Sequence, residues 1–150
     1  MRDAVEKDIP KCAEILSDNT MWERYDRSIT HATEFLEREV RSGHHVWVYE
    51  QDGSVVGFAG CIENGMMGEF PYIRVLAVER QHRGKGIGTR MLDYIEDKMF
   101  ATSHLLFMMV SDFNIEAKRL YNRLGYETIG TVNNYKKQGV NEFLLVKRKS

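Results

Sequence analysis

The sequence is poor in residues that cross-link or break a chain. Among its 150 residues only two are cysteine and two are proline, and the formal net charge is −1. Cys12 and Cys61 have no CxxC spacing, which indicates two buried thiols in a reducing compartment rather than a disulfide framework. No apolar run approaches the roughly 18 residues of a membrane-spanning helix. The balanced charge argues against general affinity for nucleic acid.

The first residues also lack the features of a secretory leader. Asp3, Glu6 and Asp8 appear at once and no apolar segment follows them. We therefore expect a cytoplasmic protein that does not associate with membranes. A chain of this length buries roughly 70% of its unfolded surface. We expect one domain over residues 1–150.

Charge is unevenly distributed along the chain. Residues 1–70 carry 7 lysines and arginines against 14 acids, whereas residues 71–150 carry 14 against 8. This asymmetry suits an anionic ligand bound by the C-terminal half and a cationic ligand met by the N-terminal half. Solvated charges without a functional role are the alternative.

Hydrophobic periodicity predicts an alternation of helices and strands. A strand–helix–strand crossover around residues 72–110 implies a parallel pair, and the hairpins imply antiparallel pairs. The fold class is α/β (α+β mixed), with a twisted sheet of about six to seven strands and helices on both faces. Asp8 is expected to cap the first helix, and Thr30 or Thr33 the second. The expected helices are 9–16, 32–40, 89–100 and 115–124, and the expected strands are 45–50, 55–62, 72–78, 105–110, 126–132 and 142–147.

A glycine-rich basic loop stands between a predicted strand and a predicted helix. Its glycines allow backbone N–H groups to approach a ligand closely, and the helix N-terminus adds donors and a positive dipole end. Arg83 and Lys85 add positive charge, so the loop is suited to a pyrophosphate. It is not a Walker A loop, because Gly86 follows Lys85, and its glycine spacing differs from a dinucleotide fingerprint. The loop reads Arg83-Gly84-Lys85-Gly86-Ile87-Gly88-Thr89.

This loop resembles the pyrophosphate motif of the GCN5-related N-acetyltransferase (GNAT) family, Arg/Gln-x-x-Gly-x-Gly/Ala. The segment from Asn114 to Tyr126 is similar to the family's second cofactor motif, Asn-x-x-Ala-x-x-x-Tyr-x-x-x-Gly-Phe/Tyr. The resemblance extends to the order of elements over nearly the whole chain. It implies a three-layer GNAT-type fold whose central parallel strands splay apart to hold coenzyme A, with acetyl-CoA as the cosubstrate.

The resemblance also implies residue roles. Tyr121 would protonate the leaving thiolate, since a phenol is a suitable donor for a thiol. The alternatives are a core tyrosine for Tyr121, a helix N-cap for Asn114 and a helix cap for Thr89. The residues expected to bind the cofactor are Leu76, Ala77, Val78, Arg83, Gly84, Lys85, Gly86, Ile87, Gly88, Thr89, Asn114 and Ala117.

The family reaction is direct attack of an amine on the acetyl thioester. Its general base is not evident here. Some family members carry a glutamate at about the position of Tyr72, and some ribosomal-protein acetyltransferases carry one at the position of Met109. Neither residue is a carboxylate here. Glu69 could act through a water chain, or be an exposed loop acid. The histidines have no ligand partners at suitable spacing, so no metal is expected.

The acyl acceptor is expected at the loop between the first two helices. Trp22 and Tyr25, together with Tyr72, offer aromatic surfaces for binding it, although Trp22 could simply pack against the sheet. Glu23, Asp26 and Glu69 add negative charge, which favours a cationic small molecule or a peptide amine. The alternatives to an enzyme are a non-catalytic acyl-CoA-binding sensor and a purely structural protein. The strands at 126–132 and 142–147 could leave an edge for a homodimer.

Overall fold

The computed structural model describes residues 1–25 and 27–150. A seven-stranded mixed sheet lies at the centre, in the order β1-β2-β3-β4-β5-β7-β6. The helices are α1 (Ile9–Ser17), α2 (Thr20–Arg24), α3 (Ile29–Arg41), α4 (Ile87–Met99) and α5 (Ile115–Arg123), with 3-10 turns at Glu6–Asp8 and Arg80–His82. The strands are β1 (Arg2–Asp3), β2 (His45–Gln51), β3 (Ser54–Met66), β4 (Phe70–Val78), β5 (Leu105–Ser111), β6 (Glu127–Val132) and β7 (Glu142–Arg148).

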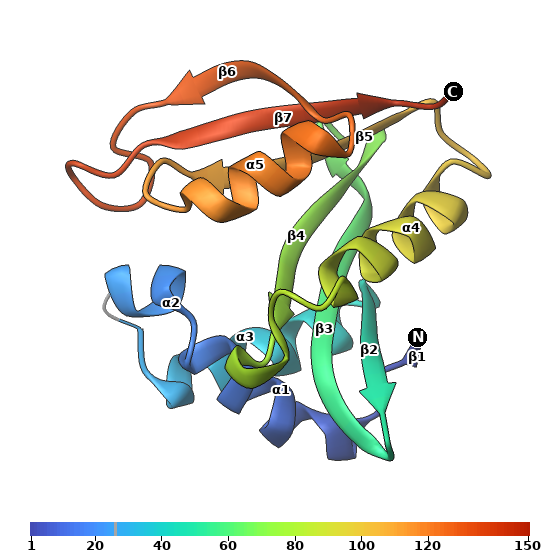
Figure 1. Cartoon of the computed structure of the whole chain (residues 1–150), viewed down its shortest axis with the longest axis vertical. Coiled ribbons are helices and arrows are strands. Elements are labelled where there is room, and N and C mark those ends of the chain that lie inside the picture. The colour runs from blue at the N-terminus through green and yellow to red at the C-terminus, as the bar shows by residue number, and fades with distance from the viewer. Residues whose placement is uncertain (26) are drawn as a thin grey trace.

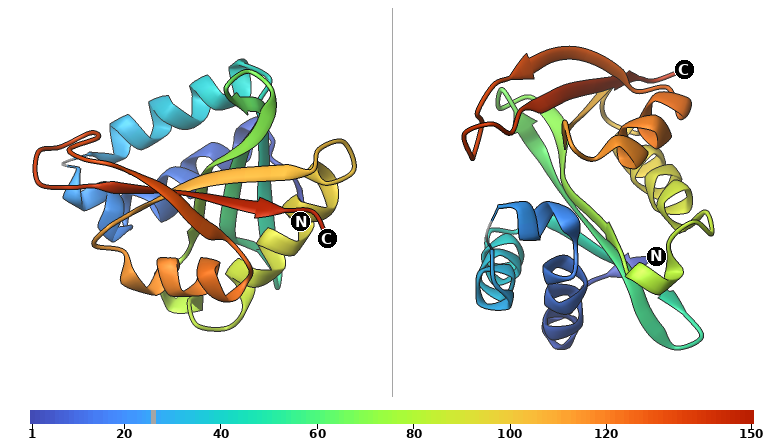
Figure 2. Two further views of the ribbon diagram at one scale, coloured as in Figure 1. Left: turned by 90° about the horizontal axis from the view of Figure 1, so that it is seen from above. Right: turned by 60° about the vertical axis from the view of Figure 1, so that its left-hand side comes forward.

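The helices cover both faces of the sheet, as the sequence predicted (Figures 1 and 2). On one face α4 and α5 pack against the sheet around Met91, Leu92 and Ile95, which are fully buried. On the other face α1 and α3 bury Leu16 and Leu36 against β3 and β4. These side chains recur at helical spacing, so each helix turns one apolar stripe toward the sheet.

The sheet opens between its two central strands. β4 and β5 are parallel, and in the described part of the chain they pair only through Tyr72 with Phe107 and Ile73 with Met108. Beyond Ile73 the two strands diverge, so β4 continues beside β3 alone (Figure 1). This confirms the predicted splay of the central parallel strands.

Several local expectations are corrected by the structure. Asp8 precedes α1, but its carboxylate does not cap that helix; it accepts hydrogen bonds from Arg2 and from the Val5 N–H. Ser28, rather than either threonine, caps α3, and its Oγ accepts from the His31 N–H. The strand expected over 55–62 is longer in the structure, because β3 runs on to Met66. Among residues 1–25 and 27–150, no helix is long and apolar enough to cross a bilayer.

Candidate active site

The glycine-rich loop leaves the N-terminus of α4 without a capping side chain. Gly86 is the N-cap residue, with φ +80°, and Gly84 has φ +74°. Both φ values lie in the left-handed region that glycine tolerates best. A Cβ at either position would meet nothing within 4 Å, so open space faces the loop. The first N–H groups of α4 therefore remain available to an anion.

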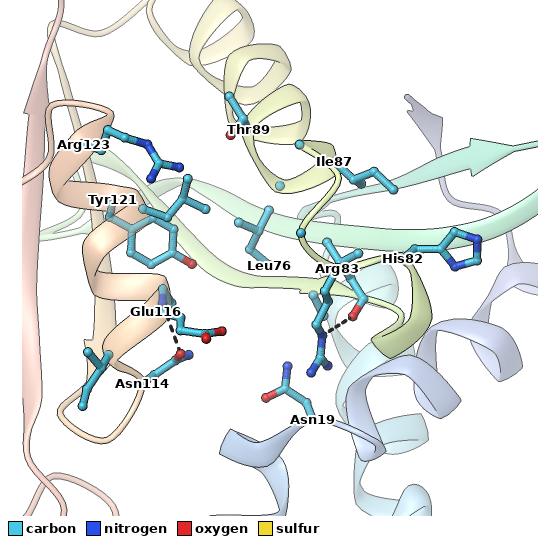
Figure 3. Close-up of a pocket in the computed structure, with 18 of the residues that line it drawn as sticks. Asn19, Leu76, His82, Arg83, Ile87, Thr89, Asn114, Glu116, Tyr121 and Arg123 are labelled. Atoms are coloured by element: carbon cyan, nitrogen blue, oxygen red, sulfur yellow. Dashed lines mark hydrogen bonds between the residues drawn. The ribbon is translucent and has the colours of Figure 1, made fainter.

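The free edge of β4 supplies a second set of backbone groups. The Glu79 N–H donates to the Val56 carbonyl on β3, and successive residues of a strand point their backbone groups to opposite sides. Leu76 and Val78 therefore turn their N–H and C=O groups away from β3, into the gap left by β5. The Val78 carbonyl already accepts a hydrogen bond from Arg83 Nε at 2.9 Å (Figure 3).

The glycine-rich loop, the free edge of β4 and helix α5 enclose a cavity of about 580 Å³, which we call the glycine-loop cavity. Tyr121 projects its hydroxyl into this space toward Leu76 (Figure 3). Asn114 caps α5, because its side chain accepts from the Ala117 N–H at 3.4 Å. The lining residues are Asn19, Leu76, Ala77, Val78, His82, Arg83, Gly84, Gly86, Ile87, Gly88, Thr89, Phe113, Asn114, Ile115, Glu116, Ala117, Leu120, Tyr121 and Arg123.

The structure thus brings together nearly all the residues predicted to bind the cofactor. Lys85 is the exception, because its side chain is exposed and does not line the cavity. Thr89 lines the cavity but does not cap α4. Glu69 lies in the exposed β3–β4 turn and lines neither this cavity nor the one described next. The structure therefore offers no support for Glu69 as a base.

Tyr121 is a buried phenol at the wall of the glycine-loop cavity. Its ring packs against Tyr126 at a centroid distance of 6.1 Å, and the residue is 9% exposed. Burial raises the pKa of Tyr121 to about 12, because the anionic form loses hydration. The hydroxyl is therefore protonated at neutral pH and can donate a hydrogen bond.

A second cavity, of about 600 Å³, lies between α3, β4 and the β6–β7 connection; we call it the α3 cavity. Trp22, Tyr25 and Tyr72, which the sequence analysis proposed to bind the acyl acceptor, all line this cavity. The full lining comprises Leu16, Trp22, Tyr25, Arg27, His31, Glu34, Phe35, Arg38, Ile62, Gly65, Tyr72, Arg74, Val75, Met109, Tyr135, Lys136 and Glu142. Glu23 is absent from this lining, and Asp26 lies outside the described residues.

Glu142 is the carboxylate that sequence reasoning missed. It lines the α3 cavity and is only 5% exposed. Its Oε1 accepts hydrogen bonds from the Tyr25 hydroxyl and from Ser111 Oγ, the latter at 2.6 Å. Burial, and then the bond to Glu142, raise the pKa of Tyr25 to about 12, so this phenol is a donor at neutral pH.

The position of Glu142 follows from strand order. Glu142 begins β7 directly opposite Ser111 at the end of β5, and Met109 on β5 lines the same cavity. The cavity therefore contains a carboxylate on β7, the strand next to Met109. A charged residue at the start of a strand looks solvent-exposed in a sequence, and only the β5–β7 pairing reveals its burial.

Comparison with known proteins places the chain in a family. Residues 9–126 match the family model described as acetyltransferase (GNAT) family. An uncharacterized N-acetyltransferase of Methanocaldococcus jannaschii is 34% identical over 105 residues, 69% of this chain; the chain spans 65% of that relative's length. The chain belongs to the GNAT family of acetyltransferases.

Solved structures share the fold over almost the whole chain. A ribosomal-protein-alanine N-acetyltransferase from Brucella melitensis has a TM-score of 0.77 and 26% identity, covering 99% of this chain and 98% of its own. A putative acetyltransferase from Salmonella typhimurium has a TM-score of 0.75 and 19% identity, covering 98% of this chain and 91% of its own. The overall fold is therefore shared with these proteins.

Proposed function

We propose that the protein is an N-acetyltransferase that moves an acetyl group from acetyl-CoA to an amine within a ternary complex. One observation carries this proposal: consecutive residues of β4 line two cavities, one bounded by an uncapped helix N-terminus and the other containing a buried carboxylate. Family membership supports acyl transfer. The Salmonella typhimurium neighbour was solved with its cofactor acetyl-CoA, which supports the same cosubstrate here.

The glycine-loop cavity fits the chemistry of coenzyme A. The open space at Gly84 and Gly86 suits a pyrophosphate, whose charge the helix N-terminus stabilises. The inward-facing groups of Leu76 and Val78 can pair with the amides of a pantetheine arm. Because the Val78 carbonyl already accepts from Arg83, an incoming amide would share this oxygen or displace that side chain.

Acetyl-CoA, when bound, supplies a thioester that an unprotonated amine attacks, so that the C–N bond forms and the C–S bond breaks. The residues of the chain then have three tasks. The Leu76 N–H can donate to the carbonyl oxygen as negative charge develops there. Tyr121 can donate a hydrogen bond to the departing sulfur. Its pKa of about 12 lies above the reference value near ~8.5 for a thiol, which favours charge stabilisation by hydrogen bonding over full proton transfer.

Product analysis tests this proposal. The purified chain is incubated with acetyl-CoA and a panel of primary amines, and both free thiol and acetylated amine are measured. We expect amine-dependent thiol release with one acetylated product per thiol. Tyr121→Phe is expected to lower kcat about 100-fold, whereas Tyr94→Phe, which removes a hydroxyl outside both cavities, should not.

The same assay separates an enzyme from a sensor. The sensor alternative takes its support from Met109 and Tyr72, which stand where other family members carry a glutamate. It predicts acetyl-CoA binding without acetylated product from any amine. That outcome would refute the proposed transferase.

A further inference from the structure

We propose that the acyl acceptor is a primary amine that carries an anionic group, such as a carboxylate, a few bonds from its nitrogen. In this arrangement Glu142 receives the ammonium, and cationic side chains at the rim of the α3 cavity bind the anionic group. The inference rests on the proposed acetyl transfer and specifies its substrate class.

Glu142 is suited to an ammonium because only one of its oxygens is occupied. Tyr25 and Ser111 both donate to Oε1, and Oε2 makes no hydrogen bond to any described residue. Glu142 lines the cavity, so a substrate ammonium bound there would supply opposite charge and further donors to this carboxylate. The two donors at Oε1 hold the group in one orientation, because Ser111 lies on the neighbouring strand β5.

The rim of the α3 cavity is cationic, contrary to what the acidic N-terminal half suggested. Arg27, Arg38, Arg74 and Lys136 line it, against Glu34 and Glu142. Arg74 is engaged by the buried Glu39, at 3.1 Å.

The remaining rim charges favour an anion. Arg27 and Arg38 form no ion pair with any described side chain, whereas Glu34 lies one turn from Arg38 on α3 and offsets part of the positive charge. Desolvation, and then repulsion from Arg27 and Arg74, lower the pKa of Lys136, although Glu142 partly opposes this. An anionic group on the substrate would relieve that repulsion.

Tyr25 contacts both Glu142, proposed to receive the ammonium, and Lys136, proposed to bind the anionic group. Its hydroxyl donates to Glu142, while Lys136 Nζ lies 5.7 Å from the centroid of its ring. The Glu142 carboxylate and the Lys136 ammonium therefore both lie beside the same tyrosine side chain. An acceptor that reaches both has its amine and its anionic group only a few bonds apart, as in amino acids, short peptides or a peptide N-terminus followed by an acidic residue.

The proton balance of the reaction is simple in this arrangement. The substrate ammonium gives one proton to Glu142 Oε2, and its freed lone pair attacks the thioester carbon. The nitrogen loses a second proton as the amide forms, and the sulfur leaves with the electron pair of the C–S bond. One of the two protons ends on the thiol and the other passes to solvent, so the net products are an amide, a thiol and one proton.

The test compares amines that differ only in charge. One arm uses β-alanine, β-alaninamide and ethylenediamine; the other uses C-terminally amidated hexapeptides with Asp, Asn or Lys at the second position. We expect kcat/KM to be at least about tenfold higher for a carboxylate form than for its amide, the equivalent of about 1.4 kcal/mol. The arm that shows the preference identifies the source of the acceptor, free amino acid or peptide.

Variants test which residues bind the ammonium of the substrate and which bind its anionic group. The double variant Arg38→Gln, Lys136→Gln should abolish the preference for the carboxylate form, because the KM of that form should rise. The control Arg41→Gln, on the same helix but outside the cavity, should retain it. Glu142→Gln should lower kcat/KM for every amine about 100-fold and leave the Kd for acetyl-CoA unchanged, which also shows that the variant is folded.

The outcomes are distinguishable. Turnover without a carboxylate preference, or with a preference for the cationic forms, would overturn this inference and leave acetyl transfer intact. Turnover of no amine by a protein that binds acetyl-CoA would refute the proposed function and this inference together.

Discussion

Val75 and Leu76 are consecutive residues of β4, yet they line different cavities. Leu76 borders the glycine-loop cavity and Val75 borders the α3 cavity. Successive residues of a strand point to opposite faces of the sheet, and here the neighbouring strand β5 has already diverged. The two cavities therefore meet β4 at adjacent residues, as expected if a cofactor in one is to react with an amine in the other.

The pH dependence of the reaction should reflect the amine rather than Tyr121. Tyr121 acts in its protonated form, which predominates below its pKa of about 12. It therefore produces no falling limb in the range assayed. Between pH 6 and 10, Tyr121→Phe should lower kcat/KM by the same factor at every pH, without changing the shape of the profile. A falling limb below pH 10 that disappears in Tyr121→Phe would contradict this assignment.

Two glycines of the loop should respond oppositely to alanine. Gly86 has φ +80°, so Gly86→Ala should reduce the free energy of unfolding by about 1 kcal/mol. Gly88 lies inside α4, and its added Cβ would only touch Leu120 at 3.6 Å. Gly88→Ala should therefore be neutral or stabilise the protein by up to about 1 kcal/mol. Urea denaturation measures both, and equal effects would argue against the described loop conformation.

The Arg2–Asp8 pair should make stability sensitive to acid. Hydrogen bonds from Arg2 hold the pKa of Asp8 below its model-compound value of 3.8. This contribution is complete above that value and is lost as the pH falls through the lower pKa of the folded state. Asp8→Asn should therefore destabilise the protein at pH 7 and flatten the decline of its Tm between pH 5 and 3. An unchanged decline in the variant would assign acid sensitivity to other groups.

Local patterns predicted much of the fold because local physics determines it. The glycine spacing from 84 to 88 and the apolar stripe of Met91, Leu92 and Ile95 located the loop and α4 to within two residues. The fully apolar run beginning at Leu105 identified the central strand β5. The glycine-rich loop, which the sequence predicted to bind a pyrophosphate, therefore borders a cavity in the structure.

Other features depended on partners distant in sequence. Glu142 is buried only because β7 pairs with β5, and its donor Tyr25 is 117 residues away. The carboxylate of Asp8 is taken by Arg2, which overrides its local tendency to cap a helix. The acidic composition of the N-terminal half likewise did not predict that the rim of the α3 cavity is cationic. Lys136 reaches this cavity from the β6–β7 connection.

The most direct test of the account is a calorimetric titration of acetyl-CoA into the wild-type protein and into Gly88→Glu. Gly88 lines the cavity in the first turn of α4, and its backbone tolerates a side chain, so the variant should fold while placing bulk and negative charge beside the proposed pyrophosphate site. Gly88→Ala serves as the matched control. We expect one site with micromolar affinity in the wild type and in Gly88→Ala, and at least a hundredfold loss of affinity, about 2.7 kcal/mol, in Gly88→Glu. Absence of binding by the folded wild type, or undiminished binding by Gly88→Glu, would contradict it.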